Sequence, residues 1–125
     1  MKLYLDIDGV LLHPKEDKAA EHAAELIEYI TSEFDCYWLT THCKGDAGPA
    51  VQYLLDYFPD RIVEKLMKIK PTYWETLKTE AIDFDSNFIW LDDYPFQAEK
   101  EVLRNFATLE SLYTVNLSRE NELLN

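Results

Sequence analysis

Several residue types are scarce in this sequence, and each scarcity excludes a class of protein. The 125 residues include only two cysteines, Cys36 and Cys43, which are too few for a disulfide scaffold and lack the spacing of a zinc site. Basic residues number 12 against 24 acidic ones, and the formal net charge of −12 argues against a broad nucleic-acid-binding face or an anionic membrane surface. No apolar run approaches the roughly 20 residues of a membrane span. We therefore expect a soluble, cytoplasmic protein with reduced thiols.

Glycine and proline are also sparse, at three and five residues, and no stretch rich in Gly, Ser or Pro divides the chain. With 47% hydrophobic and 14% aromatic residues, a chain of this length can bury one core. The first strand-like pattern starts at Lys2, so we expect no signal peptide. We expect a single domain over residues 1–125.

Apolar runs alternate with amphipathic segments along the chain. Strand-like runs cover residues 2–7, 36–40, 87–93 and 111–117, and helical periodicity covers residues 18–34, 48–58, 71–82 and 95–107. The pattern at residues 61–67 is ambiguous, and a short strand is our interpretation. Because the strands show no polar face, the alternation predicts an α/β fold: a three-layer, Rossmann-like parallel sheet with helices on both faces.

Acidic and hydroxyl residues lie at the carboxyl ends of three of the predicted strands. They are Asp6 and Asp8 in "YLDIDGVLL", Thr40 and Thr41 in "WLTTH", and Asp92 and Asp93 in "WLDDYP". In parallel sheets, ligands bind at the carboxyl ends of the strands, so we expect all of these residues at one rim.

Each motif has a structural explanation when it is taken alone. An Asp-Gly pair is common at turns, threonine favours strand ends, and an acidic pair before Pro95 readily forms a turn. The combination is different, because a folded protein avoids clustered anions unless a cation occupies the cluster. Oxygen-only ligands suit magnesium, so the predicted cofactor is Mg²⁺.

The order of these motifs resembles that of the haloacid dehalogenase-like (HAD) hydrolases, which are mostly magnesium-dependent phosphatases. The family signature is D-x-D-G after the first strand, Thr or Ser after the second, a Lys before the last acidic strand and an acidic pair after that strand. Here "DIDGV", "WLTT" and "WLDD" match in order and span most of the chain. The sequence also looks like a small capless branch, some members of which are associated with RNA repair.

The resemblance implies a phosphatase that works through an aspartyl-phosphate intermediate. Asp6 would be the nucleophile, and Asp8 would protonate the leaving oxygen and then activate water. Thr40 would donate a hydrogen bond to a phosphoryl oxygen. A lysine would offset charge in the transition state, with Lys78 as the choice and Lys70 as the second candidate.

The resemblance also implies where the metal would bind. Asp6, the backbone carbonyl of Asp8, and Asp92 or Asp93 would hold Mg²⁺. Gly9 would let the chain turn sharply beside the site.

Three further residues lie near these motifs. His42 could touch a substrate, although a lone histidine in a loop is more often only a loop residue. Tyr94 and Phe96 could stack on a base or ring, but packing is the more common role of such residues.

The implied HAD-like domain has no room for a cap domain, because only some ten residues separate "DIDGV" from the first predicted helix. An open site suits large or varied phosphorylated substrates, either small molecules or macromolecules. A nucleic acid would fit only as a phosphorylated end, because phosphate binding depends mainly on Lys and Arg. The motifs do not indicate the physiological substrate, the pathway or the oligomeric state.

Two other functions share sequence features with the implied phosphatase. A phospho-receiver domain has a similar length and an acidic pocket with Thr and Lys, but it places its acidic pair first and its phosphorylated Asp in mid-chain. A catalytically idle HAD-like binding module is the other rival, and it is disfavoured because every charged role is filled. Magnesium-dependent turnover separates the enzyme from both.

Overall fold

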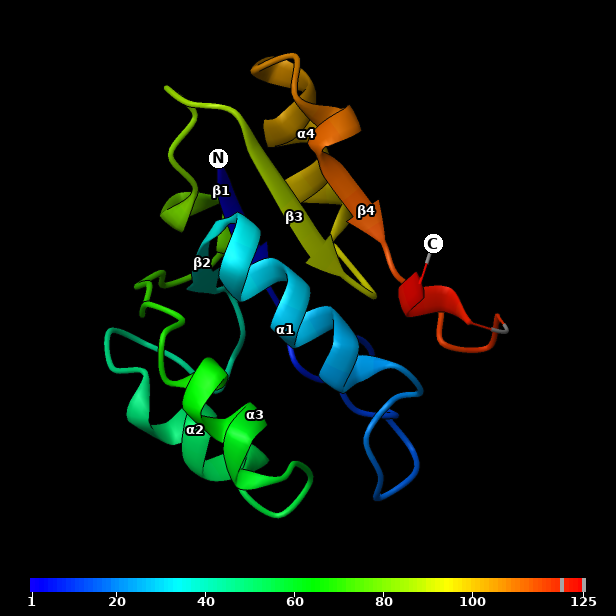
Figure 1. Cartoon of the computed structure of the whole chain (residues 1–125). Helices are drawn as coiled ribbons and strands as arrows, with labels where there is room; N and C mark the ends of the chain where they lie inside the picture. Colours follow the sequence, from blue (N-terminus) through cyan, green and yellow to red (C-terminus); the bar gives the residue numbers. More distant parts are fainter. Residues whose placement is uncertain (120, 125) are drawn as a thin grey trace.

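A computed structural model describes residues 1–119 and 121–124 of the chain. The protein is built around one parallel four-stranded sheet (Figure 1). The strands lie in the order β2-β1-β3-β4, with bounds β1 (Lys2–Leu5), β2 (Asp35–Trp38), β3 (Phe88–Asp92) and β4 (Leu112–Thr114). The α-helices are α1 (Ala23–Glu33), α2 (Gly48–Leu54), α3 (Asp60–Leu66) and α4 (Gln97–Asn105). Short 3-10 helices are η1 (Lys78–Ala81), η2 (Leu109–Ser111) and η3 (Glu122–Leu124). The predicted α/β class with a parallel sheet is confirmed.

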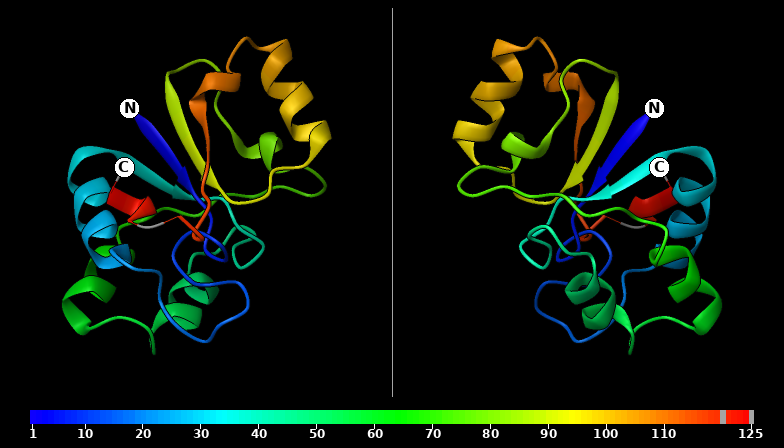
Figure 2. Two further views of the ribbon diagram at one scale, coloured as in Figure 1. Left: turned by 90° about the vertical axis from the view of Figure 1, so that its right-hand side faces the viewer. Right: turned by 90° about the vertical axis from the view of Figure 1, so that its left-hand side faces the viewer.

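Alternation along the strands gives each face of the sheet its own core. Leu5 and Trp38 point to one face, where they pack with buried residues of α1, α2 and α3. Tyr4 and Trp90 point to the other face, where they pack with Leu103 of α4. Figure 2 shows α1 on one side of the sheet and α4 on the other, so helices cover both faces in three layers. This arrangement is consistent with the expected Rossmann-like fold.

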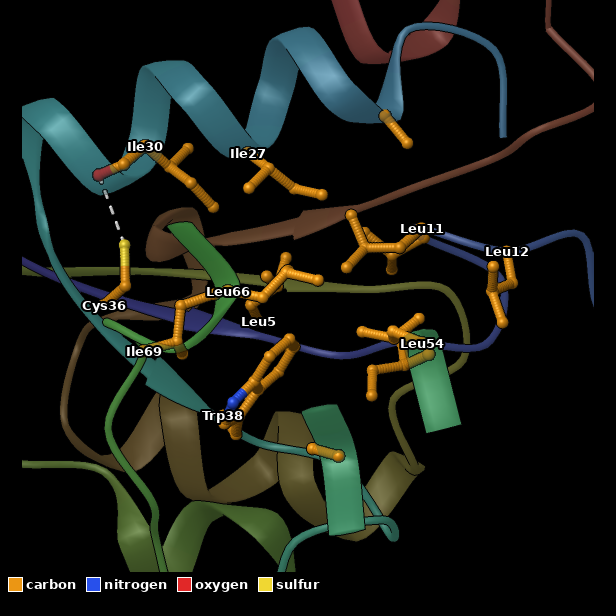
Figure 3. Close-up of a cluster of buried hydrophobic side chains, with 14 of the residues drawn as sticks. Leu5, Leu11, Leu12, Ile27, Ile30, Cys36, Trp38, Leu54, Leu66 and Ile69 are labelled. Carbon is orange, nitrogen blue, oxygen red and sulfur yellow. Dashed lines mark hydrogen bonds between the residues drawn. The ribbon is translucent and has the colours of Figure 1, made fainter. Parts of the chain in front are cut away.

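The core under α1 also contains both cysteines, of which Figure 3 labels Cys36. The Cys36 thiol donates to the carbonyl oxygen of Ile30 in α1 at 3.2 Å. Cys36 and Cys43 are both buried and form no disulfide, in agreement with the expectation of free thiols.

The interpretation of residues 61–67 as a short strand is wrong, because Asp60–Leu66 is the helix α3. Ile62 and Leu66 lie one helical turn apart and are both fully buried. Pairing beside β2 instead occurs at Lys70, which forms an isolated parallel bridge with Tyr37. The chain therefore returns to the edge of β2 after α3, a few residues later than predicted.

The helix predicted for residues 71–82 is also wrong, since only the 3-10 helix η1 forms there. The backbone N–H groups of residues 75, 76 and 77 donate to the Glu80 carboxylate at 3.0, 3.1 and 2.8 Å. The carbonyl oxygen of Thr72 accepts from the N–H of Gly45 at 2.7 Å. These side-chain and long-range partners satisfy backbone groups that a helix would satisfy internally.

The remaining predicted elements form, with shorter bounds than expected. Helix α1 begins at Ala23 rather than at residue 18, because His22 has a left-handed backbone with φ of 66°. Helix α2 ends at Leu54 rather than at residue 58. Within the described part of the chain, no helix is long and apolar enough to cross a membrane.

Candidate active site

The carboxyl ends of β1 and β3 bring Asp6 and Asp92 together. The two strands pair in parallel, and the N–H of Asp6 donates to the carbonyl oxygen of Leu91 at 3.1 Å, just beyond the last strand pair. Because side chains alternate, Asp6 follows Tyr4 and Asp92 follows Trp90 onto the face that α4 covers. Their exposed fractions are only 8% and 1%. The fold therefore places two like charges in a buried setting.

Lys78 in η1 supplies a cation to both carboxylates. Its Nζ lies 3.1 Å from Oδ2 of Asp6 and 2.7 Å from Oδ2 of Asp92. Burial lowers the pKa of Lys78, but the charges of Asp6 and Asp92 outweigh burial, so the pKa is raised overall and the amine stays charged. Lys70, the second candidate, pairs instead with Asp35 at the amino end of β2, at 2.9 Å. The structure thus places Lys78, and not Lys70, at the site.

Glu99 fixes the turn that carries Lys78. Its Oε2 accepts from the backbone N–H of Lys78 at 2.7 Å, and its Oε1 accepts from the N–H of Phe96 at 2.8 Å. Glu99 lies in the first turn of α4 and is buried. Glu99 was not among the residues predicted for the site. The available signal was its place at the third helical position, where a glutamate reaches back to the start of its own helix.

Asp93 completes a group of three carboxylates, which we call the acidic group: Asp6, Asp92 and Asp93. One oxygen of each lies within 4.8 Å of the others. The Asp93 carboxylate rests against Gly9, where a Cβ would lie 2.0 Å from Oδ2 of Asp93. Gly9 also has a φ of +82°, so both the turn and the close approach require glycine.

The electrostatics of the acidic group show an excess of negative charge. Burial raises the pKa of Asp6 to about 7, with a further contribution from the charge of Asp92 and an opposing one from Lys78. Burial and the charge of Asp92 also raise the pKa of Asp93. One ammonium group offsets only one of three carboxylates. The group therefore has the donors and the charge to hold a divalent cation.

Thr40 lies at the same edge of the sheet, in the turn after β2. The N–H of Leu39 donates to the carbonyl oxygen of Leu5 at 2.8 Å, which continues the pairing of β2 with β1 as far as this turn. Thr40 is buried, whereas Thr41 is exposed. Of the two threonines, the structure therefore brings Thr40 into the rim.

The side chain of Asp8 lies outside the acidic group. Its Oδ2 is 2.9 Å from Nε2 of His42, and its Oδ1 accepts from the Tyr53 hydroxyl at 2.9 Å. The His42 and Tyr53 rings stack, with centroids 3.9 Å apart and an angle of 16° between the planes. His42 was considered as a possible substrate contact or, more commonly, a loop residue, and Tyr53 was not predicted at all. No local pattern in the sequence reveals contacts between the turn after β1 and residues of the β2–α2 region.

Tyr94 and Phe96 do not pack into the core, contrary to the more common role considered for them. They are 76% and 56% exposed, and their rings meet edge to face with centroids 6.5 Å apart. The two rings therefore leave an aromatic surface in solvent directly after the acidic pair.

A cavity of about 620 Å³ opens beside Asp93 and Gly9. The loop of residues 13–16 and the segment of residues 114–118, which begins at the last residue of β4, form its other walls. This volume lies within the range of small-molecule sites. The cavity therefore has room for a small molecule.

Comparisons with known proteins leave the chain without an identified relative. No family model, curated protein or solved structure matches it. The motifs "DIDGV", "WLTT" and "WLDD" and the meeting of their residues at one edge of the sheet remain the basis for assigning chemistry.

Proposed function

We propose that this chain is a HAD-like, magnesium-dependent phosphomonoesterase that works through an aspartyl-phosphate. The observation that supports it most is the contact of the Lys78 ammonium with both Asp6 and Asp92, beside a third carboxylate within 4.8 Å. A purely structural ion network has no need for the third carboxylate, because Asp93 adds a partly buried negative charge, which costs stability. The order of the motifs along the chain supports the same chemistry.

The acidic group fits Mg²⁺ by its chemistry, because all three donors are hard oxygens and their charge exceeds that of the one lysine. Asp6, Asp92 and Asp93 would hold the ion through their side chains. When bound, Mg²⁺ would neutralise the carboxylates and polarise the phosphoryl oxygens.

In the first step, a carboxylate oxygen of Asp6 attacks phosphorus and forms an acyl-phosphate bond. The bond from phosphorus to the leaving oxygen breaks, and the carboxylic acid of Asp8 gives its proton to that oxygen, which leaves as an alcohol. Lys78 favours the ionised form of Asp6 that makes the attack, and the Thr40 hydroxyl donates to a phosphoryl oxygen.

In the second step, the Asp8 carboxylate takes a proton from a water molecule, whose oxygen attacks phosphorus. The bond from phosphorus to the Asp6 oxygen breaks, which releases inorganic phosphate and restores the Asp6 carboxylate. Asp8 is again protonated, so the cycle closes with one ester hydrolysed and one water consumed.

The cavity beside Asp93 suits a phosphorylated small molecule, and the open edge also admits an exposed phosphate on a macromolecule. The formal net charge of −12 disfavours a long polynucleotide and leaves a phosphorylated nucleic-acid end as the compatible form. A cytoplasmic location is part of the same proposal.

The test is phosphate release from phosphosugars, nucleotides, phosphopeptides, phosphorylated oligonucleotides and an aryl phosphate, with and without Mg²⁺. We expect turnover that depends on Mg²⁺. We also expect the Asp8→Asn protein to accumulate phosphate on Asp6 from the aryl phosphate, detectable as added mass on the peptide that contains Asp6.

Other outcomes would contradict the proposal in distinguishable ways. Phosphorylation of Asp6 by acetyl phosphate, with no catalytic turnover, would indicate a receiver-like domain. Neither phosphorylation nor turnover would indicate an idle binding module. Asp17→Asn is the control, because Asp17 accepts from the Tyr57 hydroxyl outside the site.

A further inference from the structure

The network around Asp8 joins three segments that are far apart in the sequence. Asp8 lies in the turn after β1, His42 in the loop after β2, and Tyr53 in α2. His42 Nε2 and the Tyr53 hydroxyl each lie 2.9 Å from a different oxygen of the Asp8 carboxylate. Two partners on two oxygens fix both the position of the carboxyl group and its rotation.

Stability alone gives little reason for this network. The side chains of His42 and Asp8 are 27% and 46% exposed, and exposed charge pairs stabilise proteins only weakly. The Tyr53 ring is also partly exposed. The core clusters of buried residues include none of the three.

We propose that His42 and Tyr53 are positioning residues that hold the Asp8 carboxyl group for proton transfer to the leaving oxygen. This inference rests on the proposed phosphatase function. A carboxyl oxygen has two lone-pair sites, so both contacts can persist while one oxygen also carries or receives the transferred proton. General acid catalysis depends on such alignment, because the proton donor must lie within hydrogen-bond reach of the departing atom.

The stacked rings allow each hydrogen bond to be removed separately. Tyr53→Phe removes the hydroxyl and keeps the ring, and His42→Phe removes the ring nitrogen and keeps a ring that can stack on Tyr53. His42→Gln restores an N–H donor without the ring. Each variant therefore changes the hold on Asp8 with little change in packed volume.

The experiment compares kcat/KM, which reports only the steps up to release of the alcohol, for an alkyl phosphate and for 4-nitrophenyl phosphate, whose leaving group needs little protonation. We expect Tyr53→Phe and His42→Phe to lower kcat/KM for the alkyl ester by about tenfold or more, and for the nitrophenyl ester by less than about twofold. His42→Gln should retain more alkyl activity than His42→Phe. In an Asp8→Asn background, neither substitution should slow the alkyl ester further, because each acts through Asp8.

Tyr57→Phe is the matched control, because Tyr57 donates to Asp17 and not to a residue of the site. It should leave the ratio of the two rates unchanged, and urea unfolding of each variant checks that it is folded. Equal slowing of both esters, no slowing of either, or undiminished slowing in the Asp8→Asn background would overturn the positioning role alone. Absence of phosphate release from the wild-type protein with Mg²⁺ would instead overturn the proposed function, and this inference with it.

Discussion

Asp6 and Asp8 are two residues apart in the sequence, yet their surroundings are opposite. Asp6 is buried and contacts the ammonium group of Lys78 at 3.1 Å. The side chain of Asp8 is 46% exposed and is held by an imidazole and a phenol. Two identical side chains therefore have different dielectric surroundings and different partners, which is how proteins assign different tasks to paired carboxylates.

The difference arises where β1 stops. Strand alternation would place Asp6 and Asp8 on the same face, but β1 ends at Leu5 and the chain turns at Gly9. Ile7, between the two aspartates, is fully buried and anchors this turn in the core. Asp6 thus keeps the direction of the strand, whereas Asp8 is turned toward α2.

Removing the buried member of the pair should have the largest effect. In Asp6→Asn, an amide replaces the attacking carboxylate, so magnesium-dependent phosphate release should fall by at least about a thousandfold. Steady-state release of phosphate from 4-nitrophenyl phosphate measures this. An Asp6→Asn protein with wild-type activity would rule out the mechanism.

Replacing Lys78 should destabilise the buried surroundings of Asp6 and leave the exposed surroundings of Asp8 unchanged. In Lys78→Met, Asp6 and Asp92 lose the ion pairs at 3.1 and 2.7 Å, so the free energy of unfolding should fall by about 3 kcal/mol. Urea unfolding without metal measures the loss. Lys70→Met is the matched control, because its ion pair with Asp35 is exposed, and its effect should be far smaller. Equal losses in the two variants would contradict the assignment of Lys78.

Magnesium should stabilise the region around Asp6 by mass action. At about 100 times its dissociation constant, Mg²⁺ should add about 2.7 kcal/mol to the free energy of unfolding, measured by thermal or urea unfolding. Asp92→Asn together with Asp93→Asn should abolish this gain, whereas Asp8→Asn should retain most of it, because the Asp8 side chain lies outside the acidic group. An unchanged melting temperature in millimolar Mg²⁺ would mean that the acidic group is not a metal site.

The smallest expected effect is a dependence of stability on pH in the metal-free protein. The pKa of Asp6 is raised to about 7 by burial, so between its unfolded value and about 7 the native state binds a proton that the unfolded state has lost. Stability should therefore fall as the pH rises, by about 1 kcal/mol from about pH 6 to about pH 8. Urea unfolding with a chelator measures this slope. Asp6→Asn should reduce this slope to the part that Asp93 contributes. An undiminished slope would contradict the attribution of the pH dependence to Asp6.

Local patterns were sufficient to predict the sheet and the residues at its rim. Alternating apolar runs mark the strands, and Asp6, Thr40 and Asp92 were predictable because each stands where such a run ends. Helix α3 was mispredicted although Ile62 and Leu66 have helical spacing, because the segment is short. The loop before η1 was mispredicted because Glu80, a side chain within the predicted helix, satisfies its backbone.

Tertiary contacts determine the surroundings of Lys78 and the partners of Asp8. Lys78 was preferred to Lys70 because of its place shortly before the acidic strand, and the position of η1 against Glu99 brings Lys78 to the acidic group. The partners of Asp8 depend on how the β2–α2 connection folds back over the turn after β1. Such contacts have no local signature, so they could not be predicted.

The place of β1 in the sheet has a consequence for protein synthesis. β1 is made first but lies between β2 and β3, and its register pairs Lys2 with Phe88 and Leu5 with Leu91. Until β3 leaves the ribosome, a nascent chain can pair β1 with β2 only and presents the other side of β1 as an unpaired apolar edge. Premature termination before Phe88 would therefore yield a fragment prone to aggregate, and it would lack Asp92 and Asp93 as well.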